Sequence, residues 1–239
     1  MKIAILSDIH GNMEALQAVG ESYDELWVLG DLVNYGPNPG EVVDFVRRHA
    51  AVVVRGNHDH AIGTGENPRC SAAFTEMARE VQAYTERVLS DEQRAYLRSL
   101  PLSARRVVGN TSFFLCHATP SVPLFKYLPA SAALWAPEVQ SADADVFWVG
   151  HTHLPFSLEV GAKRVVNPGS VGQSKHGLPH SCFAIYEHGH IRLESVAYDV
   201  NETVKKVQAL PVSADVISRL VAVLQTGLPP TNACDRSPR

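Results

Sequence analysis

Five short polar blocks in this 239-residue sequence each follow directly after a run of apolar residues. Their aspartate, histidine and asparagine side chains offer oxygen and nitrogen ligands that suit divalent manganese, iron, zinc, nickel or cobalt. These ligands outnumber what one tetrahedral ion needs, so the sequence predicts two ions that share a bridging carboxylate. Two ions about 3.5–4 Å apart can stabilise both the attacking and the leaving oxygen of an in-line displacement. The blocks are Asp8-Ile9-His10-Gly11-Asn12, Gly30-Asp31, Gly56-Asn57-His58-Asp59, His117-Ala118 and Gly150-His151-Thr152-His153.

The apolar runs before these blocks predict buried β-strands, over residues 2–6, 26–29, 51–54, 112–116 and 145–149. Helical patterns separate the first three strands, over residues 13–20 and 41–49. Alternating strands and helices favour a parallel sheet, and ligands bind beyond the carboxyl ends of such strands. We therefore expect the five blocks to meet at one edge of a sheet.

The rest of the chain carries weaker patterns. Residues 71–99 predict two helices that are separated near Ser90, which has the spacing of a capping box with Gln93. Residues 107–116 predict a hairpin around Gly109-Asn110. Later short strands indicate a second, more antiparallel sheet, and they are expected near residues 156–160, 164–166, 182–187 and 191–198. Residues 201–225 are weakly helical, and the proline-rich residues 226–239 predict a flexible tail.

The order Asp-x-His, Gly-Asp, Gly-Asn-His-Asp, His, Gly-His-x-His resembles the signature of the calcineurin-like metallophosphoesterases, over residues 1 to about 175. Ser7 to Asn12 and the run Asn167-Pro168-Gly169-Ser170 are similar to the small bacterial and archaeal phosphodiesterases within that family. The resemblance implies an α/β fold of two packed mixed β-sheets flanked by helices, a four-layer αββα sandwich. We expect one such domain over residues 1–225, with a helical insert near 60–100.

The resemblance also implies a role for each block. His58 would act on the substrate as the acid for the leaving oxygen or as a transition-state stabiliser, and Asp59 would orient His58 through a hydrogen bond. The cofactor would be two divalent ions, with manganese preferred and iron, zinc, nickel, cobalt or magnesium as alternatives. The first ion would be held by Asp8, His10, Asp31 and His153, and the second by Asp31, Asn57, His117 and His151.

These roles predict a phosphoesterase, with a phosphodiester as the preferred substrate. A hydroxide held between the ions would attack phosphorus directly, without a phosphoenzyme. The alternatives are a phosphomonoesterase, a nucleotide or protein phosphatase with the same site, and a non-catalytic scaffold of the same fold. Asn34 and Tyr35, shortly after Asp31, are candidates for substrate contact, as is Asn12, for which helix capping is the alternative.

Composition excludes several other classes. A net charge of -4 and a pI near 6.2 argue against a broad nucleic-acid or acidic-membrane surface. No stretch approaches the roughly 18 apolar residues of a membrane span, and the N-terminal apolar run is too short for a signal peptide. The four cysteines contain no C-x-x-C pair and fit a reducing compartment. We expect a cytoplasmic enzyme that acts on a small-molecule phosphate ester or nucleotide, and a homo-oligomer is left open.

Overall fold

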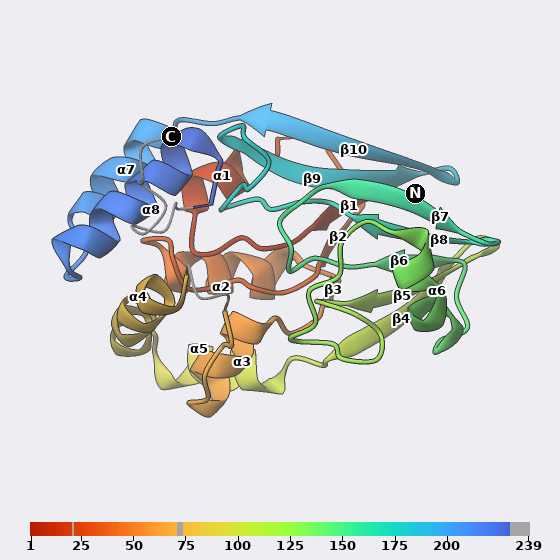
Figure 1. Cartoon of the computed structure of the whole chain (residues 1–239), viewed down its shortest axis with the longest axis horizontal. Coiled ribbons are helices and arrows are strands. Elements are labelled where there is room, and N and C mark those ends of the chain that lie inside the picture. Colours follow the sequence, from red (N-terminus) through yellow and green to blue (C-terminus); the bar gives the residue numbers. More distant parts are fainter. Residues whose placement is uncertain (21, 71–73, 230–239) are drawn as a thin grey trace, which may run out of the picture.

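A computed structural model of the chain describes residues 1–20, 22–70 and 74–229. Within these residues two five-stranded β-sheets pack face to face, and helices cover their outer faces (Figure 1). Each sheet contains both parallel and antiparallel pairs. The expected fold class of two packed mixed sheets flanked by helices is therefore confirmed.

The first sheet has the strand order β10-β9-β1-β2-β3. Its parallel part, β1 to β3, is the predicted one, and helices α1 (Met13–Gln17) and α2 (Pro39–His49) connect these strands. β9 runs antiparallel to β1, with Tyr186 opposite Ile3. The bounds of the strands are β1 Lys2–Leu6, β2 Glu25–Val28, β3 Val52–Val53, β9 His180–Glu187 and β10 His190–Ala197.

The second sheet has the strand order β4-β5-β6-β8-β7. β4 and β5 form the predicted hairpin, β5, β6 and β8 are parallel, and β7 is antiparallel to β8. The prediction that the four late strands form the second sheet together is wrong, because β9 and β10 extend the first sheet. The bounds are β4 Ser103–Val108, β5 Thr111–Cys116, β6 Val146–Trp148, β7 Phe156–Val160 and β8 Lys163–Asn167.

Large side chains from both sheets fill the space between them. Trp27 of β2 meets Phe113 of β5 edge to face, with 5.4 Å between ring centroids, and Trp148 of β6 joins the same cluster. All three are at most 1% exposed. Burial of one such side chain stabilises the fold by roughly 2–3 kcal/mol. This core fixes the two sheets against each other, so the carboxyl ends of β1, β2, β5 and β6 keep a constant spacing.

The helices agree with the sequence patterns except for α3 and α6, which were not predicted, and α6 contains Pro137. Ser90 and Gln93 form the expected capping box at the start of α5, since Ser90 Oγ accepts from the Gln93 N–H at 3.2 Å.

Residues 71–73 and 230–239, which belong to the predicted helical insert and tail, lie outside the described residues. Helix α8 continues to Thr226. The remaining bounds are α3 Asn57–Thr64, α4 Thr75–Val88, α5 Asp91–Ser99, α6 Ala132–Gln140, α7 Val200–Gln208 and α8 Ala214–Thr226. None of the described helices is long and apolar enough to span a bilayer.

Candidate metal centre

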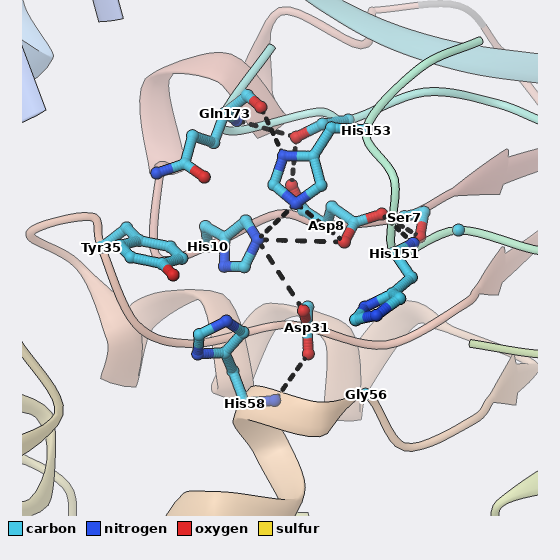
Figure 2. Close-up of polar contacts among 12 residues, drawn as sticks. Ser7, Asp8, His10, Asp31, Tyr35, Gly56, His58, His151, His153 and Gln173 are labelled. Atoms are coloured by element: carbon cyan, nitrogen blue, oxygen red, sulfur yellow. Dashed lines mark hydrogen bonds and ion pairs between the residues drawn. The ribbon is translucent and has the colours of Figure 1, made fainter. Parts of the chain in front are cut away.

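The seven predicted ligands lie together at the carboxyl ends of the strands, and each is at most 3% exposed. Asp8 and His10 follow β1, and Asp31 follows β2. His117 comes directly after β5, His151 and His153 follow β6, and Asn57 begins α3. Figure 2 shows Asp8, His10, Asp31 and His153 directed toward one another. The sequence-based expectation that five segments converge on one edge is met.

The first group of donors consists of Asp8, His10 and His153. Nε2 of His153 lies 3.3 Å from Oδ1 of Asp8, and Nε2 of His10 lies 3.8 Å from the same oxygen. The two Nε2 atoms are 3.2 Å apart. Three ligand atoms from two strand ends therefore face one small space.

The second group consists of Asp31, His117 and His151, with Asn57 beside them. Nε2 of His117 lies 3.2 Å from Oδ2 of Asp31 and 3.2 Å from Nδ1 of His151. Oδ1 of Asn57 lies 3.0 Å from the same Nε2 atom. Oδ2 of Asp31 also faces the first group, at 3.8 Å from Nε2 of His10. Asp31 thus stands between the two groups.

Hydrogen bonds behind the centre orient the imidazole rings. Nδ1 of His10 donates to the Val33 carbonyl at 3.1 Å. Nδ1 of His117 donates to the Leu29 carbonyl at 2.8 Å. Because Nδ1 of each ring donates to a carbonyl, Nε2 is the atom that can bind a cation once it carries no proton. His153 is held in the same way by the carbonyl of Gln173, at 2.6 Å.

Five of the seven ligands have a left-handed backbone, which non-glycine residues rarely adopt. The φ angles lie between 49° and 67° at Asp8, His10, Asp31, His151 and His153. Each such residue costs of order 1–3 kcal/mol, and this strain is concentrated at functional sites. Close packing adds to the constraint, because a Cβ atom on Gly56 would collide with the Asp31 carboxylate. The strained backbone conformation therefore places these side chains in the centre and lowers the stability of the fold.

Charge in the centre is unbalanced without a cation. Burial raises the pKa of Asp8, but neighbouring His153 outweighs it and holds the pKa well below its usual range. Burial also raises the pKa of Asp31, but neighbouring His117 outweighs burial, so this pKa also lies well below its usual range. Burial lowers the pKa values of His10 and His151. His117 differs, because the charge of Asp31 outweighs burial and raises its pKa to about 9, so its proton offsets only part of the charge of the two buried carboxylates.

A divalent cation fits these residues. Oδ2 of Asp8 accepts hydrogen bonds from Ser7 Oγ at 2.6 Å and from the His151 N–H at 3.1 Å. Oδ1 of Asp8 is buried and has no hydrogen-bond partner among the described residues. A buried, ionised oxygen without a donor is costly unless it binds a cation. Oxygen and imidazole donors with no thiolate match the hard and intermediate divalent metals.

His58 lies beside the centre but belongs to neither donor group. Its backbone N–H donates to Oδ1 of Asp31 at 2.9 Å, and its ring meets the rings of His10 and Tyr35 edge to face. Asn34 Nδ2 lies 2.8 Å from Nδ1 of His58. Cys70 Sγ lies 3.4 Å from Nε2 on the other side of the ring. The ring of His58 is thus fixed next to the ligands, with Nε2 on the side of Cys70.

Asp59 does not make the predicted hydrogen bond to His58. Its Oδ2 atom accepts from the backbone N–H groups of Asp31 at 2.8 Å and Gly56 at 3.0 Å. Its Oδ1 atom accepts from the Leu32 N–H at 2.8 Å. Asp59 therefore joins α3 to the segment after β2, and Asn34 takes the place beside the His58 ring.

The three predicted substrate contacts are all buried. Asn12 caps α1 by accepting from the Ala15 N–H at 3.1 Å, and its amide also donates to the Gly172 carbonyl and to Tyr198. Asn12 is fully buried, and these contacts agree with the capping interpretation. Tyr35 packs against the rings of His10 and His58, at 4.9 Å from each. Asn34 and Tyr35 therefore support the site from behind His58.

Sequence reasoning missed three residues near the centre. Cys70 contacts His58, Tyr127 stacks on the His151 ring with 3.8 Å between centroids, and Lys175 lies on the loop after β8. None of the three follows an apolar strand directly or belongs to a recognisable spacing. Their positions result from contacts between distant segments.

Several known proteins are similar to this chain in sequence or in structure. The profile of the calcineurin-like phosphoesterase superfamily domain matches residues 1–190. An uncharacterized protein of Methanocaldococcus jannaschii is 30% identical over 228 residues, which cover 86% of this chain and 91% of that protein. Phosphodiesterase YfcE of Escherichia coli is 28% identical over 200 residues, 76% of this chain and 85% of that protein. The crystal structure of a metallophosphoesterase from Sphaerobacter thermophilus superposes with a TM-score of 0.77 and 32% identity, covering 93% and 98% of the two chains.

Proposed function

This chain belongs to the calcineurin-like phosphoesterase superfamily and is a metal-dependent phosphoesterase, and we propose that it hydrolyses phosphodiesters at a dinuclear metal centre. The observation that carries the proposal is the position of Asp31. Its Oδ2 atom faces His117 at 3.2 Å and His10 at 3.8 Å, so one carboxylate serves both donor groups. A single-ion site would leave half of these buried donors without a function.

Each ion has four protein ligands in this proposal. Asp8, His10, His153 and Asp31 would hold the first, and Asp31, Asn57, His117 and His151 would hold the second. The bound ions would neutralise charge on the phosphoryl oxygens and lower the pKa of bound water. Water would be the nucleophile in this proposal, so we expect direct hydrolysis without a phosphoenzyme.

His58 is the proposed acid for the leaving oxygen. Burial lowers its pKa, but Cys70 and Asp31 outweigh burial and raise the pKa above its ordinary value. A raised pKa favours the protonated form of the imidazole, which an acid catalyst needs. The Asn34 amide lies 2.8 Å from Nδ1, so a proton for the leaving oxygen would be on Nε2, which would exchange its present contact with Cys70 for the substrate.

The preference for a diester is supported by the similarity to the Escherichia coli phosphodiesterase. Monoester, nucleotide and protein phosphatase activities would use the same residues. A non-catalytic scaffold would not require seven buried ligands together with a positioned histidine, and this argues for an enzyme.

The decisive experiment is a substrate panel on chelator-stripped protein reconstituted with manganese, nickel, magnesium or zinc. Bis-aryl phosphodiesters, aryl phosphomonoesters, cyclic nucleotides and dinucleoside polyphosphates are compared at equal metal content. We expect diester hydrolysis that depends on added metal and is fastest with manganese. A protein that binds two ions per chain but hydrolyses none of these substrates would contradict the proposal and favour the scaffold.

A further inference from the structure

Lys175 places a positive charge at the edge of the metal centre, and none of the roles above uses it. We propose that Lys175 binds the non-bridging oxygens of the substrate's phosphoryl group and thereby favours phosphate groups with two negative charges. This inference rests on the proposed function, because it assigns a residue that selects among phosphate esters at the same site.

The loop that carries Lys175 is fastened to the ligands themselves. Ser170 Oγ donates to the Asp8 carbonyl at 2.7 Å, and the Gly172 N–H donates to the same carbonyl at 3.0 Å. Gln173 then accepts from Nδ1 of His153 at 2.6 Å through its carbonyl. Lys175 follows two residues later, so its backbone is held near Asp8 and His153, two of the three ligands of the first group.

The ammonium group of Lys175 packs on an aromatic ring that is connected to the centre through further ring contacts. Nζ lies 4.4 Å from the centroid of the Phe74 ring. Phe74 packs edge to face against Tyr35, with 5.9 Å between centroids, and Tyr35 contacts both His10 and His58. These ring contacts connect the ammonium group to the side of the centre where the proposed acid and the first metal ligands meet.

This ammonium group has no anionic partner within the part of the chain that the structure describes. It forms neither a hydrogen bond nor an ion pair there, and its side chain is half-buried. Burial lowers its pKa to about 8, although Asp8, Cys70 and Asp31 are near enough to oppose this effect. Asp8 and Asp31 are directed at the metal sites, so neither is free to pair with Lys175. A half-buried cation without a hydrogen-bond acceptor is unfavourable, and an incoming phosphate oxygen would satisfy it.

Charge then distinguishes the substrates. A phosphomonoester near neutral pH carries up to two negative charges on the phosphoryl group, whereas a diester carries one. Both would contact Lys175, but the dianion gains more from a cation in a site of low dielectric constant. Loss of Lys175 should therefore affect monoesters and inorganic phosphate more than diesters.

The test compares Lys175→Gln, Lys175→Arg and a control, Lys205→Gln. Lys205 is an exposed lysine on α7 that pairs with Glu202, far from any proposed role. Binding of inorganic phosphate to the metal-loaded proteins is measured by titration calorimetry, and kcat and KM are measured with an aryl monoester and a bis-aryl diester. Metal content and thermal unfolding are recorded for each variant to exclude a loss of the site.

We expect Lys175→Gln to weaken phosphate binding and to reduce kcat/KM for the monoester by roughly 10- to 100-fold, with a smaller loss for the diester. Lys175→Arg should recover most of both losses, and Lys205→Gln should match the wild type. Equal losses for both substrates, or phosphate binding unchanged in Lys175→Gln, would overturn the inference. A wild-type protein without hydrolytic activity would refute the proposed function instead, and the calorimetric comparison would still decide whether Lys175 binds phosphate.

Discussion

Nε2 of His117 and Oδ2 of Asp31 lie 3.2 Å apart, and both residues are at most 1% exposed. Burial by itself would lower the pKa of His117, but the charge of Asp31 raises it to about 9. In the protein without metal, His117 is therefore protonated near neutral pH. Its proton partly replaces the charge that a metal ion would supply.

Metal binding at the second group should consequently depend on pH. The ion must displace the proton of His117, so its affinity should rise by about tenfold per pH unit between pH 6.5 and 9, and level off above. Titration calorimetry with manganese in two buffers of different ionisation enthalpy should detect close to one proton released near neutral pH. An affinity that stays constant over this range would contradict the assignment of His117 as a ligand.

The stability of the metal-free protein should fall as pH rises, whereas the metal affinity rises. The folded pKa of His117 lies above its ordinary value of 6.5, so the ion pair with Asp31 stabilises the fold fully below pH 6.5. This contribution is lost as pH rises through about 9. Urea unfolding of stripped protein at several pH values measures the effect, and His117→Gln should remove this pH dependence.

Replacement of Asp31 by asparagine should release both metal ions. The variant keeps the shape of the side chain but loses the negative charge that faces both donor groups. Metal analysis should fall from about two ions per chain to near zero, whereas Asp8→Asn, which alters the first group, should retain about one. Asp143→Asn, at an exposed position on the loop before β6, serves as the control. Retention of one ion by Asp31→Asn would show that this carboxylate serves a single ion.

Replacement of Asp59 should lower the stability of the fold, because its carboxylate binds backbone groups and does not contact the His58 ring. Its two oxygens accept three hydrogen bonds from the buried backbone N–H groups of Asp31, Leu32 and Gly56. Asp59→Ala leaves these donors without acceptors, which should lower the free energy of unfolding of metal-free protein by roughly 2–4 kcal/mol. Urea denaturation measures this loss, and Asp59→Asn should lose less because one acceptor oxygen remains. Unchanged stability with a reduced kcat would restore the role in orienting His58.

The positions of the candidate ligands could be predicted from sequence because their signals are local. An apolar run followed by Asp8 or His117 already places a ligand at a strand end, and parallel strands bring such ends together. The partner of a strand is not a local property, and for this reason β9 and β10 were assigned to the wrong sheet. Helix α6 was missed since Pro137 inside a helix contradicts its propensity.

Contacts around His58 could not be predicted for a related reason. Asp59 is adjacent to His58 in the chain, but the first turn of α3 directs its carboxylate toward the backbone after β2. Asn34 reaches His58 from a left-handed backbone with φ of 72°, a conformation that the sequence does not reveal. Cys70 and Lys175 come from loops whose placement depends on the complete fold.

The contact between Asn34 and His58 gives the last prediction. Asn34→Leu keeps a similar volume but removes the amide 2.8 Å from Nδ1 of His58, so the ring can rotate. We expect kcat to fall about tenfold, whereas His58→Gln should lower kcat by roughly 10²–10⁴-fold, and both variants should keep their metal ions.

A double-mutant cycle separates positioning from a general structural effect. If Asn34 acts through His58, the double variant should be no slower than His58→Gln alone, because the ring that Asn34 positions is already absent. Asn201→Leu, at an exposed position on α7, is the matched control and should leave kcat unchanged. Losses that multiply in the double variant would mean that Asn34 affects the reaction by a route independent of His58, and loss of metal from His58→Gln would place His58 among the ligands instead.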